Sequence, residues 1–200
     1  MEAKDKFTLG LELPTDPRWV NIAEMNIHEI LVDHAYCEQK AASTGISLIL
    51  QFSEKEKLVD TITSIVAEEW NHFERVLQEL RKRNMKLGTK RKDKYVEALD
   101  GVFKKGGSRD QLLLEKLLMN ALIEARSCER FKLLWKNIGD EGLSQFYYEL
   151  MVSEAGHYKT FLQLAKEYIP EETVNARWRE LLEQEAEIVK NLEVRGDRMH

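Results

Sequence analysis

The sequence predicts an all-α protein, a four-helix bundle of two helical hairpins joined by a crossover, with one further helix at the C-terminus. Its 200 residues are 43% hydrophobic, rich in Glu, Lys, Leu and Ala, and include only three prolines, a composition typical of helices. Several long segments also repeat apolar residues at the 3.6-residue period of a buried helix face. We therefore expect one domain over residues 1–200, with its core at about 17–194.

The first hairpin is predicted over residues 17–86. Proline is tolerated in the first turn of a helix, so Pro17 is expected to open the first helix, which reaches about Phe52. Ser53 and Glu56 have the Ser-x-x-Glu form of a capping box. This pair predicts a tight reversal followed directly by the second helix.

The second hairpin is predicted over residues 108–168. Ser108 follows two glycines and can cap the first of its helices, which ends at Gly139. Asp140 can cap the second, and Pro170 marks where that helix has stopped. The short Gly139 break predicts that these two helices lie antiparallel.

The remaining segments connect or extend the hairpins. Residues 88–109 are predicted to form the crossover, with one short helix at 93–103. A last amphipathic helix is expected at about 171–194, and the tail at 196–200 looks frayed. Two hairpins joined by a longer crossover form the connection of ferritin-like bundles.

The motif Glu-x-x-His occurs twice, as Glu69 with His72 and as Glu154 with His157. Each pair interrupts an apolar stripe at positions where the helical period requires a core side chain. A carboxylate and an imidazole in a core cost free energy unless they are paired, hydrogen-bonded or bound to metal. A buried Glu-His hydrogen bond is the simpler explanation for one copy, but two copies favour a metal site.

A dinuclear site in such a bundle needs one further Glu from each remaining helix. Residues equally far from the turn of an antiparallel hairpin lie at equal height, which favours Glu38 in the first hairpin and Glu124 in the second. Cys37-Glu38 and Cys128-Glu129 also look like counterparts in a pseudo-repeat, which favours Glu129 instead. At a rise of about 1.5 Å per residue, Glu129 would lie roughly 7 Å from the level of the other ligands. We keep Glu129 as a fallback ligand or as a residue that contacts a ligand.

Two further pairs of residues have less specific roles. Asp33 and His34 stand about one turn before Glu38 and are candidates to orient a ligand imidazole, although a role at the surface or the core edge fits equally well. Cys37 and Cys128 lack Cys-x-x-Cys spacing, so we interpret both as small core residues rather than redox or zinc-binding groups.

Four carboxylates and two imidazoles suit iron or manganese better than zinc, which prefers four ligands with more nitrogen or sulfur. The chemistry expected of such a centre is the activation of dioxygen. The predicted ligands are Glu38, Glu69, His72, Glu124, Glu154 and His157.

Four segments resemble those of the MiaE-type tRNA hydroxylases, a family of ferritin-like di-iron monooxygenases. They are DHAYCEQKAA (33–42), AEEWNHFERV (67–76), ALIEARSCERFKLL (121–134) and SEAGHY (153–158). The resemblance runs over roughly residues 10–195. It implies that the six predicted ligands bind two iron ions, with O2 as co-substrate. It also implies hydroxylation of the isopentenyl group of a 2-methylthio-isopentenyl adenosine next to the tRNA anticodon.

The distribution of charge is consistent with a tRNA partner. The chain has a net charge of −5, but the segment from Arg81 to Arg109 contains eleven basic and three acidic residues. Such a segment can contact phosphates, although basic runs are also common on solvated faces.

Because no flavin, nicotinamide or iron–sulfur motif is present, we expect a separate electron donor. No apolar run is long enough to cross a membrane and no signal peptide is apparent, so a cytoplasmic protein is expected.

Two other classes of function share parts of this pattern. A ferritin-like or rubrerythrin-like protein would use the same ligands for iron storage or peroxide reduction without tRNA, although the rubrerythrin form lacks its Cys-x-x-Cys module here. A metal-free helical interaction module would satisfy its Glu-His pairs internally.

Overall fold

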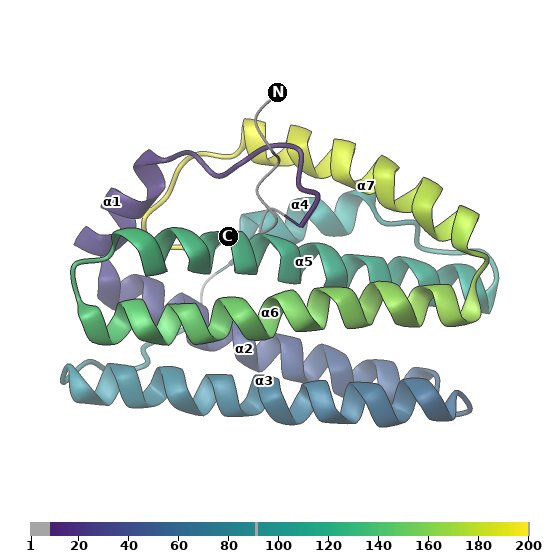
Figure 1. Ribbon diagram of the computed structural model, residues 1–200, viewed down its shortest axis with the longest axis horizontal. Coiled ribbons are helices and arrows are strands. Elements are labelled where there is room, and N and C mark those ends of the chain that lie inside the picture. Colours follow the sequence, from purple (N-terminus) through teal and green to yellow (C-terminus); the bar gives the residue numbers. More distant parts are fainter. Residues whose placement is uncertain (1–8, 91, 200) are drawn as a thin grey trace. The chain divides into compact units, whose positions relative to one another are not determined.

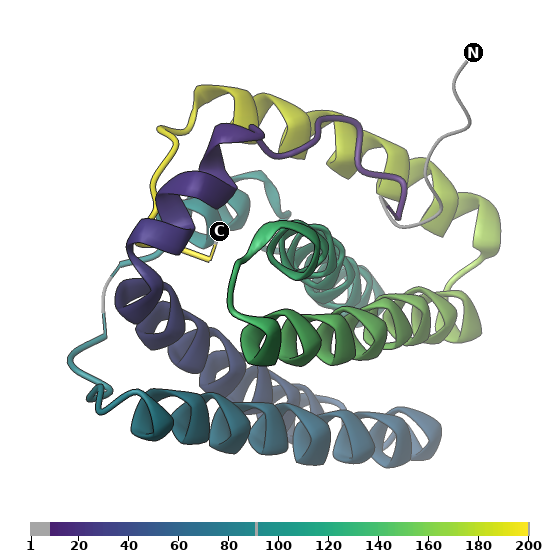
Figure 2. The same cartoon turned by 60° about the vertical axis from the view of Figure 1, so that its left-hand side comes forward.

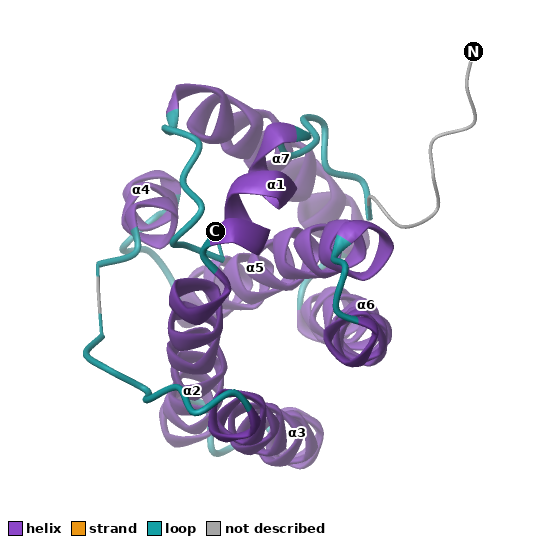
Figure 3. Ribbon diagram, turned by 90° about the vertical axis from the view of Figure 1, so that its left-hand side faces the viewer, coloured by secondary structure: helices purple, strands orange, loops and turns teal. Residues whose placement is uncertain are grey.

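A computed structural model describes residues 9–90 and 92–199, which form helices and loops without a strand (Figure 3). The predicted all-α class is therefore confirmed. Seven helices follow one another in this part of the chain (Figure 1): α1 (Arg18–Met25), α2 (Ile27–Gln51), α3 (Glu56–Lys82), α4 (Lys94–Val102), α5 (Arg109–Asn137), α6 (Glu141–Tyr168) and α7 (Glu171–Asn191). None of these helices combines the length and the apolarity that a membrane crossing requires.

The described residues divide into two compact units. The N-terminal hairpin unit contains α2 and α3 and comprises residues 21–92 with 195–199. The C-terminal hairpin unit contains α4 to α7 and comprises residues 9–20 with 93–194. Each unit thus contains one of the two predicted hairpins, and the expectation of a single domain stays a prediction.

In the N-terminal hairpin unit, α2 and α3 lie side by side and run in opposite directions (Figure 1). Gly45 allows their close approach, because a Cβ atom there would lie 2.5 Å from Cγ2 of Val66. The predicted capping box at Ser53 is wrong: α3 begins at Glu56, and its N-cap residue is Lys55, without a side-chain cap. Ser53 lies instead within the turn, which is closed by a backbone hydrogen bond between residues 55 and 52.

The first predicted helix is interrupted near its start. It divides at Asn26 into α1 and α2, whereas the sequence predicted one helix from about 17 to 52. The Asn26 side-chain amide donates a hydrogen bond to the carbonyl of Ile22 at 2.7 Å. Asparagine competes with the helical backbone in this way and favours helix ends, which accounts for the break.

In the C-terminal hairpin unit, α5 and α6 form the second hairpin (Figure 2). Both predicted N-caps of this hairpin are confirmed. Ser108 and Gln111 form a reciprocal capping box at α5, and Asp140 accepts from the Leu143 amide at 2.9 Å at α6. Helix α7 contacts α4, α5 and α6, so α5 packs against both α6 and α7.

A fully buried guanidinium ties four segments of this unit together. Arg126 on α5 donates to Glu185 on α7 through Nε at 2.9 Å and Nη2 at 2.7 Å, and to the Leu13 carbonyl at 2.9 Å. Tyr95 on α4 donates to the same Glu185 oxygen at 3.0 Å. Burial raises the pKa of the Glu185 carboxyl, although the Arg126 charge opposes this shift. Because a buried charge is costly without partners, this network fixes the unit around α5.

The C-terminal residues are docked rather than frayed. Met199 is fully buried. A Cβ atom at Gly196 would lie 2.6 Å from the Ile22 carbonyl oxygen, so only glycine permits this approach to the backbone. The prediction of a frayed tail is therefore wrong for residues 196–199, whereas residue 200 lies outside the described part of the chain.

Candidate metal centre

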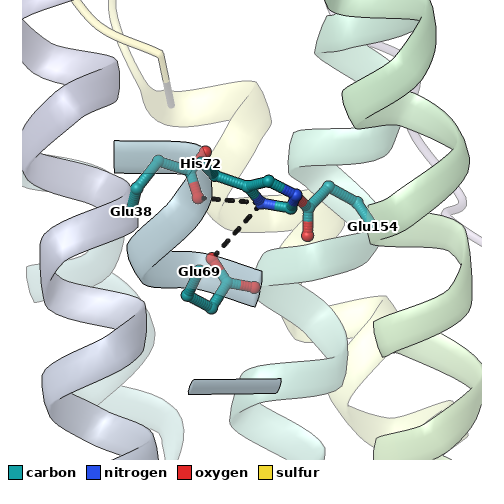
Figure 4. Close-up of side chains that lie close together, drawn as sticks. All are labelled: Glu38, Glu69, His72 and Glu154. Carbon is teal, nitrogen blue, oxygen red and sulfur yellow. Dashed lines mark ion pairs between the residues drawn. The ribbon is translucent and has the colours of Figure 1, made fainter. Parts of the chain in front are cut away.

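The N-terminal hairpin unit brings together three of the predicted ligands. Glu38 lies on α2, and Glu69 and His72 lie one turn apart on α3 (Figure 4). His72 Nδ1 is 3.6 Å from Glu38 Oε2 and 3.9 Å from Glu69 Oε2. The three residues offer ligand atoms within 4.8 Å of one another, and all three side chains are buried. We call this set the first half-site.

His34 contacts the first half-site from the preceding turn of α2. Its Nε2 lies 2.6 Å from Glu38 Oε1, and its side chain is fully buried. A histidine four residues before a glutamate lies on the same helix face. The structure thus places His34 against the carboxylate of a predicted ligand, whereas the sequence suggested that it would orient an imidazole.

The C-terminal hairpin unit brings together the other three predicted ligands. Glu124 on α5 and the pair Glu154 and His157 on α6 offer ligand atoms within 4.8 Å of one another. His157 Nδ1 lies 3.1 Å from Glu154 Oε2, and all three side chains are buried. We call this set the second half-site. Its composition, two carboxylates and one imidazole, repeats that of the first.

Glu129, the alternative to Glu124, has other partners. One carboxylate oxygen accepts from the Thr15 backbone amide at 2.8 Å, and the other accepts from the Thr15 hydroxyl and from Arg126 at 2.9 Å. The structure therefore assigns Glu129 to the buried network around Arg126 and places Glu124, rather than Glu129, beside Glu154 and His157.

The two cysteines differ in burial. Cys128 is fully buried, and its thiol donates to the Met151 carbonyl at 3.3 Å. Burial raises the pKa of this thiol to about 12, so it is protonated at neutral pH and unsuited to nucleophilic chemistry. Cys37 is only partly buried, so the prediction of a core position holds for Cys128 but not for Cys37.

The donor set matches the chemistry of an iron centre. Each half-site presents two carboxylates and one imidazole. Hard oxygen donors with a minority of imidazole favour iron or manganese, whereas zinc sites are usually closed by four ligands richer in nitrogen or sulfur. The residues present therefore fit iron, and no rearrangement within either half-site is needed to bring their ligand atoms together.

The basic segment has different surroundings in the two units. In the N-terminal hairpin unit, Lys82 and Arg83 pair with Glu79 at the end of α3. The next basic side chains along the chain, Lys86, Lys90 and Lys92, are exposed on the loop that follows. Arg91 lies outside the described residues.

In the C-terminal hairpin unit, the remaining basic residues lie on α4, on the loop before α5 and, as Arg109, at the start of α5. Lys104 lies 3.6 Å from Glu180, and Lys105 pairs with Asp100. These acidic partners offset part of the positive charge. The three loop lysines of the other unit are therefore the better candidates to contact phosphates.

Sequence reasoning missed the residues that hold this loop. The Lys86 and Gly88 carbonyls accept hydrogen bonds from His28 and Tyr36 of α2, each at 2.9 Å, and the Lys92 carbonyl accepts from Arg198 at 3.2 Å. Side chains that bind a backbone carbonyl far away in the chain have no local sequence pattern. The one hint in the sequence was that His28 and Tyr36 fall on the same predicted helix as Glu38.

Two proteins that are named as tRNA hydroxylases are similar to this chain in sequence. A tRNA 2-(methylsulfanyl)-N(6)-isopentenyladenosine(37) hydroxylase of Pseudomonas putida is 36% identical over 158 residues, which cover 79% of this chain and 76% of that protein. The Salmonella typhimurium protein of the same name is 29% identical, over 90% of this chain and 83% of the relative.

A solved structure is also similar. It is described as protein 43 with aldehyde deformylating oxygenase activity from Synechococcus, and it matches with a TM-score of 0.89 and 32% identity over 95% of this chain and 94% of that one. The sequence model of the tRNA-(MS2IO6A)-hydroxylase (MiaE) family matches residues 2–200. With two buried half-sites of the expected composition and this match over nearly its whole length, the chain belongs to the MiaE family of tRNA hydroxylases.

Proposed function

We propose that this protein is an oxygen-dependent di-iron monooxygenase that hydroxylates the isopentenyl group of a hypermodified adenosine next to the tRNA anticodon. The observation that carries the proposal is the pair of buried half-sites with identical donor composition. Membership of the MiaE family and the names of two relatives support the substrate.

The proposed iron ligands are the six residues of the two half-sites. When bound, two iron ions supply the activation of dioxygen, which protein side chains alone do not perform. The chain contributes four carboxylates that balance the metal charge and two imidazoles held one turn from a glutamate. The contact from His34 holds one Glu38 oxygen in place and restricts the orientation of that carboxylate.

The proposed tRNA contact is the loop that carries Lys86, Lys90 and Lys92. All three side chains are exposed, and lysines that neutralise phosphates release counterions, which drives binding to nucleic acid. We further propose that electrons come from a separate donor protein and that the enzyme works in the cytoplasm, where tRNA is modified.

The Synechococcus protein supports a second candidate, an activity on aldehydes. Its identity of 32% is comparable to that of the hydroxylase relatives. The cluster of exposed lysines favours tRNA, because an aldehyde offers no phosphates to such a surface. Incubation of the iron-loaded protein with a panel of aldehydes, a reductant and oxygen separates the two, and we expect no loss of aldehyde beyond that of protein-free controls.

The first test concerns the metal. Anaerobic addition of ferrous iron should load two iron ions per chain, because the two half-sites together offer six ligands. Oxygen should then produce near-ultraviolet absorption and a Mössbauer signal of magnetically coupled ferric ions. His72→Ala should lower the stoichiometry. A parent protein that retains no iron would leave the Glu-His pairs as internal hydrogen bonds and contradict the enzymatic proposal.

The second test concerns the substrate. Nucleosides of tRNA from cells with and without this gene should differ in one respect, since the hydroxylated form of the methylthio-isopentenyl adenosine should disappear and its unhydroxylated precursor should accumulate. A gene copy encoding Glu154→Ala should fail to restore the product. Unchanged nucleosides in the deletion strain would show that tRNA is not the substrate and would favour an iron-storage, peroxide-reducing or aldehyde-directed role.

A further inference from the structure

The loop that carries the exposed lysines is attached to α2 through its own backbone. His28 Nε2 donates to the Lys86 carbonyl, and the Tyr36 hydroxyl donates to the Gly88 carbonyl, each at 2.9 Å. The two donors are eight residues apart, which corresponds to about 12 Å along the helix. The loop is therefore held at two separate points on the helix that carries Glu38.

The C-terminal residues attach the end of this loop to the same helix. Arg198 Nε donates to the Lys92 carbonyl at 3.2 Å and lies 3.8 Å from Asp33 Oδ1. The Met199 backbone amide donates to Asp33 Oδ2 at 2.8 Å. The Asp33 side chain and Met199 are both buried. Asp33 thus connects α2 to the C-terminal residues.

Asp33 directly precedes the histidine that contacts the first half-site. His34 is fully buried, and its Nε2 lies 2.6 Å from Glu38 Oε1. Asp33 and His34 project from the same turn of α2, one toward the C-terminal residues and the other toward Glu38. The rotation of this turn about the helix axis is consequently defined by contacts on both sides.

We propose that Asp33 and Arg198 are positioning residues for the iron ligand Glu38, because they fix α2 to the lysine-bearing loop and to the C-terminal residues in one register. The inference rests on the proposed function, since it assumes that Glu38 binds iron. A shift of α2 by one residue would turn it by about 100°. Such a shift would remove Asp33 from the Met199 amide and leave a buried carboxylate without that partner, which is costly.

Three variants test this role. Asp33→Ala removes the acceptor, Asp33→Asn keeps an oxygen that can accept from the Met199 amide, and Arg198→Ala removes the bond to the Lys92 carbonyl while leaving Asp33 in place. Arg179→Ala is the matched control, because this arginine is exposed on α7 of the other unit. Far-ultraviolet circular dichroism confirms that each variant retains its helices.

We expect Asp33→Ala to weaken ferrous iron binding by roughly tenfold, the lower end of the loss typical for a direct partner of a ligand, because Asp33 acts on Glu38 only through the helix. The Mössbauer spectrum of the iron-loaded variant should be broader than that of the parent. Amide hydrogen exchange over α2 should be faster than in the parent, both with and without iron. Asp33→Asn should recover most of both properties, and Arg198→Ala should show a smaller change of the same sign. The control should equal the parent.

The outcomes separate the inference from the proposed function. A parent that binds no iron would contradict the proposed function. A parent that binds two iron ions, with Asp33→Ala and Arg198→Ala matching its iron affinity, spectrum and α2 exchange, would overturn the positioning role alone. If Asp33→Ala lost helicity, Arg198→Ala would decide, and a parent-like iron affinity, spectrum and α2 exchange in that variant would also overturn it.

Discussion

Glu124→Ala should abolish tight binding of the two iron ions, whereas Glu129→Ala should leave iron binding in place and lower the free energy of unfolding by about 3 kcal/mol. Glu124 offers a ligand atom within 4.8 Å of those of Glu154 and His157. Glu129 instead accepts from Thr15 and Arg126. Its removal leaves the fully buried Arg126 guanidinium with fewer acceptors, which is the usual origin of a large loss of stability.

Two measurements on the same proteins check this prediction. Iron per chain is determined after anaerobic loading, and the free energy of unfolding is determined by urea denaturation of the iron-free forms. Glu129→Gln is the control for Glu129→Ala, because it keeps an acceptor for Thr15 and should lose less stability. Iron loss in Glu129→Ala together with retention in Glu124→Ala would show that the pseudo-repeat around the two cysteines was the better guide to the ligand.

The triple substitution of Lys86, Lys90 and Lys92 by glutamine should weaken tRNA binding and flatten its salt dependence. Each lysine that contacts a phosphate contributes about 0.7–0.9 to the slope of the logarithm of affinity against the logarithm of salt concentration. Losing all three should therefore lower the slope by about 2 to 3. Iron content should stay as in the parent, because the substitutions leave the carbonyls that α2 and Arg198 bind unchanged.

A control variant removes the same amount of charge elsewhere. Lys57, Lys136 and Lys190 are exposed on α3, α5 and α7, and their replacement by glutamine should leave the slope close to that of the parent. Filter binding or fluorescence titration over a series of salt concentrations measures both. Equal slopes for the two triple variants would mean that the loop is a solvated surface and that tRNA docks elsewhere.

The features that the sequence predicted are those with a local pattern or a simple geometric rule. The helix caps at Ser108 and Asp140 depend on one side chain and an amide three residues later. The positions of Glu38 and Glu124 beside the Glu-x-x-His pairs follow from counting residues from a tight turn, because antiparallel helices with short connections keep equal heights. The repeated Glu-x-x-His motif needs only the helical period.

The features that escaped prediction depend on contacts between distant residues. Arg126 is two residues from Glu124, yet its partners Glu185 and Leu13 come from opposite ends of the chain. The C-terminal tail is held by the burial of Met199 and by the close approach to Ile22 that Gly196 permits. Neither contact has a local pattern, so the sequence of this short polar segment predicted a frayed end.

Two local errors have local causes. Ser53 has the pattern of a capping residue, but it lies within the turn that follows α2. Helix α3 therefore begins only at Glu56, with Lys55 as its N-cap residue. Asn26 divides the first predicted helix through a hydrogen bond to Ile22. Both residue types are common at helix ends, and which of several candidate positions is used depends on the path of the chain around them.

The proposed function requires this chain to transfer one oxygen atom from dioxygen to the prenyl group of a tRNA adenosine. The direct measurement combines the iron-loaded protein, tRNA bearing the methylthio-isopentenyl adenosine, a chemical reductant and isotopically heavy dioxygen, followed by mass spectrometry of the nucleosides. We predict a hydroxylated nucleoside that carries the heavy isotope. The Glu69→Ala variant should form none of this product. Oxygen consumption without any hydroxylated nucleoside, or a product whose oxygen comes from water, would contradict the account.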